Sequence, residues 1–484
     1  MATYDLAIRG GTVATGQGAI RCDIGISGGR IAALAESITD ATRVLDAAGL
    51  LVIPGGVDSH CHIAQAEANG TRHEETFATA SHSAFLGGTT SVVTFIPHIR
   101  GTALAPHVAD AEAHAARDSM LDYGFHQIIA DPSDQVLAEI PGLVARGIRS
   151  LKVFLTYEPL HLTDGEFLKV LLAARRNGCL VTVHCENFDA IEWRTRALLD
   201  AGLTAPKYHA WSRPPVVERE AAHRAIALAE LVDQPIQVFH VSCAEAAEEI
   251  ARAQARGLKV WGETCPQYLT MTADDMDRPG FEGAKFMCSP SPREAAEQGR
   301  VWEMIRRGTL DVVSSDHCGF SYEGDKGKAM NGRDAVFRDI PNGIPGIAAR
   351  LPILFSEGVA KGRIGLDKFV RLTSSNAAKL MGLYPQKGAI LPGSDADLVL
   401  WDPGDKRVLT NAMMGHAIDY TPYEGLEVTG WPVATLRRGE MVMQDGKVQA
   451  EAGSGRFLPR GPYDYIRPTG RLPNGFDAAP WPAA

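Results

Sequence analysis

Long apolar runs are absent from this 484-residue sequence, so no segment is predicted to span a bilayer. The first residues, MATYDLAIRGGTV, have no apolar core behind a basic start and do not resemble a secretion signal. An excess of basic residues is also lacking. The formal net charge is −10, which argues against a nucleic-acid or anionic-membrane partner. We therefore expect a cytoplasmic protein without either partner.

Paired cysteine motifs are missing as well. The eight cysteines show neither Cys-x-x-Cys spacing nor a dense framework, which indicates reduced thiols. Cys61 and Cys185 stand beside residues discussed below, and we interpret them as small packing residues. No Gly-x-Gly-x-x-Gly follows the first strand-like segment, which disfavours the alternative of a doubly wound sheet.

Strand-like segments occur at both ends of the chain. Near the N-terminus, DLAIRGGTV, DIGISGG and LLVIPGG alternate with glycine-rich turns and predict a small antiparallel unit. GSDADLVLWDP and VATLRRGEMVMQDGKVQ have the same character near the other end. We predict one small β-sandwich domain from residues 1–54 and 386–455. Residues 456–484, rich in Pro and Gly, are expected to be an arm, either disordered or laid on a neighbouring subunit.

The middle of the chain alternates strand-like and helical segments. TTSVVTFI is followed by ALAPHVADAEAHAARD, and IRSLKVFLTY by DGEFLKVLLAARRNG. About eight such repeats predict an α/β fold, a (β/α)₈ barrel over residues 55–385.

Polar residues lie in or just after the apolar strand segments of this middle part. Because the carboxyl ends of barrel strands form one face, we expect these side chains to converge. They are Asp58, His60, His62, Lys152, His184, His240 and Asp316.

The residue types indicate a metal site. His60 and His62 alternate along a strand, point the same way and can hold one metal ion. His184 and His240, from neighbouring strands, can hold a second, and Asp316 adds an anionic oxygen. Imidazole and carboxylate ligands suit zinc, with manganese, iron, cobalt or nickel as alternatives.

Lys152 is an unusual residue for a strand interior. A snorkelling lysine, or one paired with a carboxylate, is the ordinary interpretation. Burial would instead favour the neutral amine, which can add carbon dioxide. The resulting carbamate is anionic and has two oxygens, so it can bridge two metal ions.

Together these residues resemble the dihydropyrimidinase and hydantoinase family of cyclic amidohydrolases, within the binuclear-metal amidohydrolase superfamily. The resemblance covers roughly residues 4 to 460. The segments that carry it include PGGVDSHCH, LKVFLTY, VTVHCEN, FHVSCAEA, GETCPQYL, MCSPSPR, SSDHCGF and IPNGIPGI.

The resemblance implies a complete active site that opens dihydropyrimidines, hydantoins or related cyclic ureides and imides to N-carbamoyl amino acids or analogues. His60, His62 and Asp316 would hold one metal ion, His184 and His240 the other, and carbamylated Lys152 would bridge them. Tyr157 would stabilise the oxyanion, and Asp316 would transfer the proton. The backbone at Ser289 and Asn342 would hold the ring. The resemblance also implies that the protein is a homotetramer or a homodimer.

The match is weakest in the loop at residues 63–75. It reads IAQAEANGTRHEE and lacks the bulky apolar residues usual in this family, so the ring substituent is left open. Ile63 and Ala64 follow His62 where dihydroorotases carry an arginine. The missing arginine argues against a dihydroorotase. An allantoinase remains an alternative, although Tyr157 favours a hydantoinase over it. A non-catalytic scaffold of the same fold is the third alternative, and the six candidate ligands argue against it.

Overall fold

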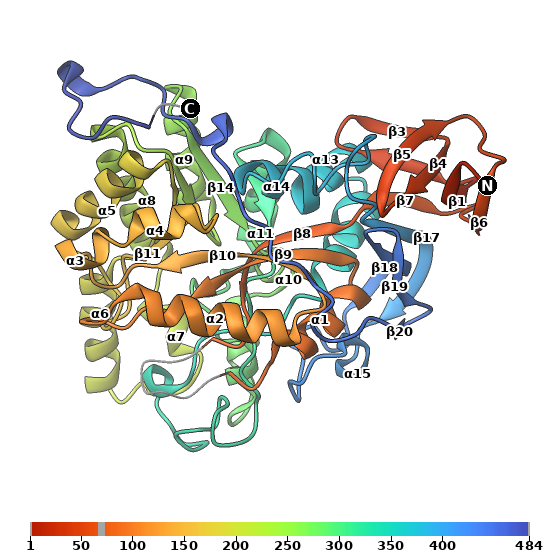
Figure 1. Cartoon of the computed structure of the whole chain (residues 1–484). Coiled ribbons are helices and arrows are strands. Elements are labelled where there is room, and N and C mark those ends of the chain that lie inside the picture. Colours follow the sequence, from red (N-terminus) through yellow and green to blue (C-terminus); the bar gives the residue numbers. More distant parts are fainter. Residues whose placement is uncertain (1, 66–72, 483–484) are drawn as a thin grey trace.

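The computed structural model describes residues 2–65 and 73–482. Its largest part is a curled sheet of parallel strands, drawn from orange to cyan in Figure 1, with helices on the outside. The strands are β8 (Gly56–His62), β9 (Thr89–Ile96), β10 (Asp122–Ile128), β11 (Ser150–Phe154), β12 (Leu180–His184), β13 (Ile236–Val238), β14 (Val260–Thr264), β15 (Leu310–Val313) and β16 (His317–Cys318).

The sheet closes through two short strands. β15 pairs with β14, and β16 pairs with β8, both in parallel, so β15 and β16 share the eighth position of the barrel. The predicted (β/α)₈ barrel is confirmed.

The outer helices begin and end where the sequence supplies caps. In α5 the Thr163 side chain accepts from the amide of Glu166, whose carboxylate accepts from the amide of Thr163, and Gly178 ends the helix at φ 64°. The main helices are α1 (Phe77–Leu86), α2 (Leu104–Asp118), α4 (Ile140–Ala145), α5 (Asp164–Asn177), α6 (Phe188–Asp200), α7 (Tyr208–Ser212), α8 (Pro215–Leu231), α9 (Ala244–Ala255), α11 (Ala295–Arg307), α12 (Arg350–Leu354), α13 (Leu366–Val370) and α14 (Asn376–Leu380). No helix in the described part of the chain has the length and apolar character needed to cross a membrane.

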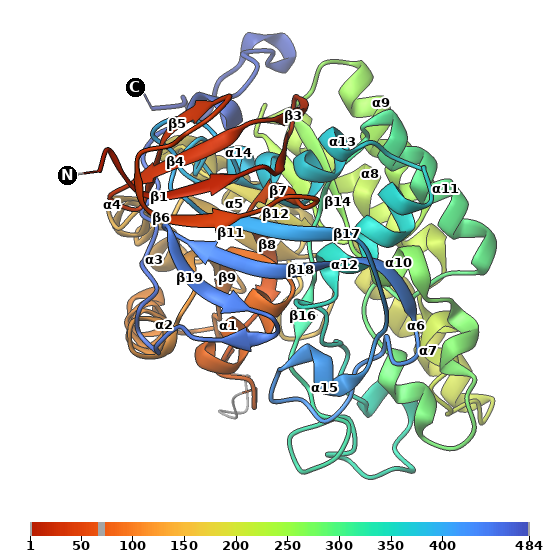
Figure 2. The same ribbon diagram turned by 90° about the vertical axis from the view of Figure 1, so that its right-hand side faces the viewer.

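A second part consists of two sheets built from both ends of the chain (Figure 2, red and blue). Their inner faces share one apolar core, to which Ile8 and Ile24 contribute from one sheet and Val52 and Leu398 from the other. The four-stranded sheet contains β1 (Tyr4–Arg9), β4 (Asp23–Ser27), β5 (Arg30–Ala35) and β6 (Ala41–Asp46), and the seven-stranded sheet contains β2 (Thr12–Thr15), β3 (Gly18–Arg21), β7 (Leu51–Pro54), β17 (Leu398–Val408), β18 (Glu427–Arg437), β19 (Glu440–Gln444) and β20 (Lys447–Val448).

The pairing of these strands differs in one respect from the prediction of an antiparallel unit. β1 pairs with β6 in parallel, and β2 pairs with β7 in parallel. The connection between each pair is long enough to return the chain to the same end of the sheet, so alternation and turns alone did not predict the strand direction.

The described residues of the C-terminal arm lie against the barrel of their own chain (Figure 1, blue). The amide of Leu458 donates to the carbonyl of Tyr123 over 2.7 Å. The guanidinium of Arg460, only 2% exposed, donates to Ser150 Oγ over 2.9 Å. Residues 456–482 therefore include an ordered part of the fold at the amino ends of β10 and β11.

A buried ion cluster joins the barrel to the two-sheet part. Lys387 Nζ lies 2.6 Å from Asp122 Oδ2, 2.7 Å from Asp397 Oδ2 and 3.0 Å from Asp395 Oδ2. Asp122 begins β10, whereas Asp397 directly precedes β17. All four side chains are buried, so removing the lysine would take away the cation that three carboxylates share, and of these Asp122 alone would keep a close ion-pair partner among the described residues, Arg438.

We expect Lys387→Met to lower the free energy of unfolding by about 3–5 kcal/mol, the usual cost of breaking a buried ion pair. The control is Lys361→Met, since Lys361 pairs with Glu357 at 2.6 Å but is 54% exposed. That change should cost less than about 1 kcal/mol. Urea unfolding of both variants measures the difference, and equal costs would contradict a structural role for the Lys387 cluster.

Candidate active site

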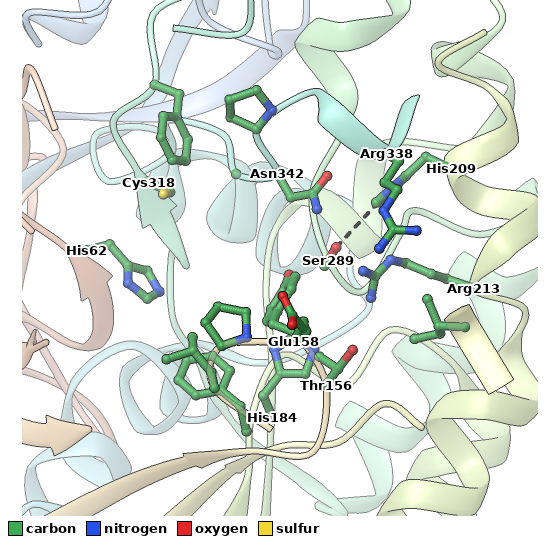
Figure 3. A pocket seen from close by; sticks show the side chains of 18 of the residues that line it. His62, Thr156, Glu158, His184, His209, Arg213, Ser289, Cys318, Arg338 and Asn342 are labelled. Carbon is green, nitrogen blue, oxygen red and sulfur yellow. Dashed lines mark hydrogen bonds between the residues drawn. The ribbon is translucent and has the colours of Figure 1, made fainter. Parts of the chain in front are cut away.

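All nine residues predicted for the site line one cavity of about 580 Å³. It opens at the carboxyl ends of the barrel strands, the face where (β/α)₈ enzymes carry their chemistry. Figure 3 shows His62, His184 and Asn342 around this cavity, although they come from different parts of the chain. The residues are His60, His62, Lys152, Tyr157, His184, His240, Ser289, Asp316 and Asn342.

One group of three side chains could hold a metal ion. His60 Nε2 lies 3.1 Å and His62 Nε2 3.6 Å from the same oxygen, Oδ1 of Asp316. One ligand atom from each residue lies within 4.8 Å of the others. His60 and His62 are alternate residues of β8, which is why their rings face the same side.

A second group lies beside the first. The rings of His184 and His240 are 4.3 Å apart between centroids, and the ring of His60 is 5.2 Å from that of His240. Lys152 stands in the middle of β11, wholly buried, with its amine 4.3 Å from the centroid of Phe239. The two groups therefore form one continuous cluster.

Two buried nitrogens of this cluster have no hydrogen-bond partner, and its donor set fits divalent cations. Among the described residues, neither Lys152 Nζ nor His240 Nδ1 has a hydrogen-bond partner, although both atoms are fully buried. Such groups are costly unless a ligand satisfies them. Neutral imidazoles and a carboxylate are the donor set that zinc and similar divalent ions prefer.

The charge states of these groups suit metal binding. Burial lowers the pKa of His184 and His240 well below the usual value, so both rings are neutral and each keeps a lone pair. Burial also lowers the pKa of Lys152 to about 7, although Asp316 and Glu263 oppose the shift. Burial would raise the pKa of Asp316, but His60 and hydrogen bonds from His60 and His62 hold it well below its ordinary value.

Three site residues have backbone conformations that are rare for side chains other than glycine. The φ angles are 68° at Tyr157, 40° at His240 and 48° at Asp316. This left-handed conformation is costly, and it persists where surrounding contacts hold it in place. Tyr157 and His240 lie just after the ends of β11 and β13, and Asp316 lies in the break between β15 and β16, so each side chain stands at the carboxyl end of a strand and lines the cavity.

The cavity also carries polar groups beside the candidate ligands that could hold a substrate. The Tyr157 hydroxyl interacts with the Ser289 side chain, and burial raises the pKa of this phenol far above its usual value. Tyr157 is therefore a hydrogen-bond donor at neutral pH. Asn342 Oδ1 is buried without a partner among the described residues and lines the same cavity, so it can accept a hydrogen bond from a bound molecule.

Sequence reasoning missed the acids that orient the histidines. Glu263 Oε1 lies 2.6 Å from His60 Nδ1, and Glu186 Oε2 lies 2.7 Å from His184 Nε2. Arg213 donates to the same oxygen of Glu186 over 2.8 Å. The signal was present, because Glu263 in GETC and Glu186 in HCEN both lie at carboxyl ends of barrel strands. Carboxylates of this kind fix the tautomer and the direction of a metal-binding ring.

Asp58, one of the strand-end residues expected to converge, does not line the cavity. Its carboxylate is buried among the strands, accepts from the amide of Ser315 over 3.1 Å and lies 3.7 Å from Arg350. As a residue of β8 two positions before His60, Asp58 lies deeper in the barrel than the rings of His60 and His62. Its role in this structure is to hold the break between β15 and β16.

The loop at residues 63–75 is described only at its two ends, since residues 66–72 lie outside the described part of the chain. Gln65 and His73 both line the cavity, and the amide of His73 donates to the carbonyl of Gln65 over 3.0 Å. Gln65 Oε1 also lies 2.7 Å from His62 Nδ1.

Comparison with known proteins places this chain in a well-populated family. Residues 51–442 match the model of the amidohydrolase family. The chain is 43% identical over 460 residues to a D-hydantoinase of Ralstonia pickettii, covering 95% of this chain and 99% of that protein. It is equally similar to a D-hydantoinase of Rhizobium radiobacter, again 43% identical with 95% and 99% covered.

Comparison with solved structures finds the same group of proteins. A dihydropyrimidinase from Brevibacillus agri NCHU1002 superposes with a TM-score of 0.91 at 42% identity, covering 94% of this chain and 99% of that one. An L-hydantoinase (dihydropyrimidinase) from Arthrobacter aurescens superposes with a TM-score of 0.86 at 30% identity, covering 95% and 100%.

The contact between Glu263 and His60 leads to a prediction about metal affinity. We expect Glu263→Gln to weaken zinc binding about 10- to 100-fold, because an amide orients the ring less firmly than a carboxylate. A chelator-competition titration measures the affinity. Glu303→Gln, on the exposed surface of α11, is the control and should bind zinc like the unmodified protein. Equal affinity in both variants would contradict the orienting role.

Proposed function

Since this chain belongs to the amidohydrolase family, and within it to the hydantoinases and dihydropyrimidinases, we propose that it hydrolyses the cyclic amide bond of hydantoins, dihydropyrimidines or related cyclic ureides and imides. The resemblance found in the sequence is confirmed. The product would be an N-carbamoyl amino acid or its analogue. The observation that carries the proposal is the meeting of the six candidate ligands, Tyr157, Ser289 and Asn342 in one cavity.

We assign the ligands of two divalent metal ions to the residues of the cluster. His60, His62 and Asp316 would hold one ion and His184 and His240 the other. The Lys152 amine would add carbon dioxide, lose a proton and become a carbamate shared by both ions. The two ions, which we propose to be zinc with manganese or cobalt able to replace it, would supply an activated water and polarise the carbonyl. The unsatisfied amine of Lys152, with its pKa near 7, supports this assignment.

Tyr157, Ser289 and Asn342 would bind and orient the ring. A cyclic amide offers N–H donors beside its carbonyl oxygens. Asn342 Oδ1 is an unsatisfied acceptor that fits such an N–H, and the backbone at Ser289 lies beside it along the cavity. The neutral Tyr157 phenol would donate to the carbonyl oxygen as negative charge develops on it.

Asp316 would transfer the proton that the reaction requires. In hydrolysis, water oxygen bonds to the ring carbonyl carbon, the carbon–nitrogen bond breaks, and the nitrogen takes up a proton. The carboxylate of Asp316 lies on the cavity and is held ionised, so it can accept the proton of the attacking water and pass it to the nitrogen.

The proposed function is tested by measuring ring opening on a panel of substrates with protein loaded with zinc or manganese. The panel contains dihydrouracil, hydantoin, 5-substituted hydantoins of both hands, allantoin, dihydroorotate and a simple cyclic imide. Opening of hydantoins or dihydrouracil is expected. Opening of allantoin alone would favour the allantoinase alternative. Absence of any turnover in protein that binds two metal ions would mean that the metal site is real and the proposed substrate class is wrong.

We expect Lys152→Ala to lose metal and activity together, because the variant lacks the proposed bridging ligand. Metal content by elemental analysis and the rate of ring opening are both measured. The control, Lys361→Met, changes an exposed lysine far from the cavity and should keep both. Full activity with full metal content in Lys152→Ala would contradict the bridging role.

We expect Tyr157→Phe to lower kcat about 10²- to 10³-fold, the usual effect of removing one oxyanion donor, and to leave metal content unchanged. Steady-state kinetics on the best substrate of the panel measures the loss. An unchanged kcat would show that the phenol does not stabilise the transition state.

We further propose a homodimer or homotetramer in the cytoplasm. Two large aromatic side chains support the assembly: Trp193 on α6 is 69% exposed and Trp211 on the adjacent α7 is 54% exposed. All eight cysteines are free, which suits a reducing compartment. The domain boundaries proposed from the sequence, 1–54 with 386–455 and 55–385, are retained.

The oligomer leads to a prediction about solution mass. Light scattering should give two or four times the 52.0 kDa of one chain, and Trp193→Glu with Trp211→Glu should lower it. A monomeric unmodified protein would contradict the assembly. An unchanged mass in the double variant would place the interface elsewhere.

A further inference from the structure

Two separate segments carry the substrate-binding positions, and the side chain of one buried lysine lies between them. Lys328 Nζ donates to the carbonyl of Met287 over 2.8 Å and to the carbonyl of Pro341 over 2.7 Å. Pro341 directly precedes Asn342, and Met287 stands two residues before Ser289. One amine thus links the chain on both sides of the proposed ring site.

The link is reinforced by the backbone. The amide of Gly343 donates to the same carbonyl of Met287 over 3.0 Å. Gly343 has φ 140°, and a Cβ there would lie 2.7 Å from the side chain of Cys318, so the chain passes this point only as glycine. Lys328 and Gly343 thus link the two segments by hydrogen bonds, and the two bonds from Lys328 are made by a side chain.

Burial of the Lys328 amine costs folding free energy. It is wholly buried, and burial lowers the pKa of its amine to about 7. The two acceptors of its hydrogen bonds are backbone carbonyls, and no carboxylate pairs with it among residues 2–65 and 73–482. Two carbonyl acceptors offset only part of the cost of burying an amine. An apolar side chain would avoid that cost, so what the lysine contributes is the pair of hydrogen bonds.

We propose that Lys328 is a positioning residue, which holds the segments of Ser289 and Asn342 at the separation that the substrate ring requires. The proposal rests on the proposed function and deepens it, because it assigns ring binding to a residue outside the cavity lining. The lysine does not touch the metal ligands. Its loss should therefore affect the binding of the ring and leave the metal centre intact.

The test compares Lys328→Met, which keeps the length of the side chain and removes its donors, with Lys328→Arg, which keeps donors. In Lys328→Met we expect KM to rise about 10-fold or more with a smaller change in kcat, because the segments of Ser289 and Asn342 are no longer held at the separation that the ring requires. Metal content should stay at the unmodified level. Lys328→Arg should recover part of the loss, and Lys361→Met should behave like the unmodified protein.

A second measurement does not depend on catalysis. Hydrogen exchange of the Gly343 amide should be faster in Lys328→Met, because the two segments separate more easily. If the unmodified protein opens no ring of the panel, the proposed function fails. An unchanged exchange rate of the Gly343 amide in Lys328→Met would then overturn the positioning role of Lys328 as well.

Other outcomes decide the proposal directly. An unchanged KM in folded Lys328→Met overturns it, and so does a loss of activity that follows loss of metal. If Lys328→Met does not fold, Lys328→Gln replaces it. Its side chain is too short to span both carbonyls, so KM should again rise, and an unchanged KM overturns the proposal.

Discussion

Closure of the barrel is the constraint on which the site depends. The eighth strand position must pair with β14 on one side and with β8 on the other, and the chain meets this demand in two pieces. Asp316 lies in the break between β15 and β16, with its amide bonded to the carbonyl of His60 over 3.0 Å. The same break that completes the sheet brings a carboxylate within reach of the two histidines of β8.

Around this break the protein buries polar groups that a purely structural core would avoid. Lys152 has aromatic neighbours but no hydrogen-bond partner in the described part of the chain, and His60 depends on Glu263 for its orientation. Each of these groups reduces the stability of the barrel until a ligand satisfies it. The Lys387 cluster differs, because its charges are compensated by their own neighbours.

Much of the fold and of the site could be predicted from local patterns. Strand and helix repeats predicted the barrel, and the alternation of His60 and His62 predicted their common direction. Glu263 was not singled out, because a glutamate in a strand is informative only once its neighbour His60 is known. Lys328 was not found for a similar reason, since its acceptors are backbone carbonyls and leave no trace in residue types. The division of the eighth strand depends on pairing with both neighbours, which no local segment encodes.

The two-sheet part has a consequence for biosynthesis. In its seven-stranded sheet β7 pairs with β17, whose residues are made only after the whole barrel segment. During translation the edge of β7 that pairs with β17 therefore has no partner until residues 55–397 have been made. The arm that packs at the amino ends of β10 and β11 is synthesised later still, so the contact of Arg460 with Ser150 can form only after the barrel strands have been made. The nascent chain must thus carry an exposed sheet edge through most of its synthesis, the stage at which this protein would be most in need of a chaperone.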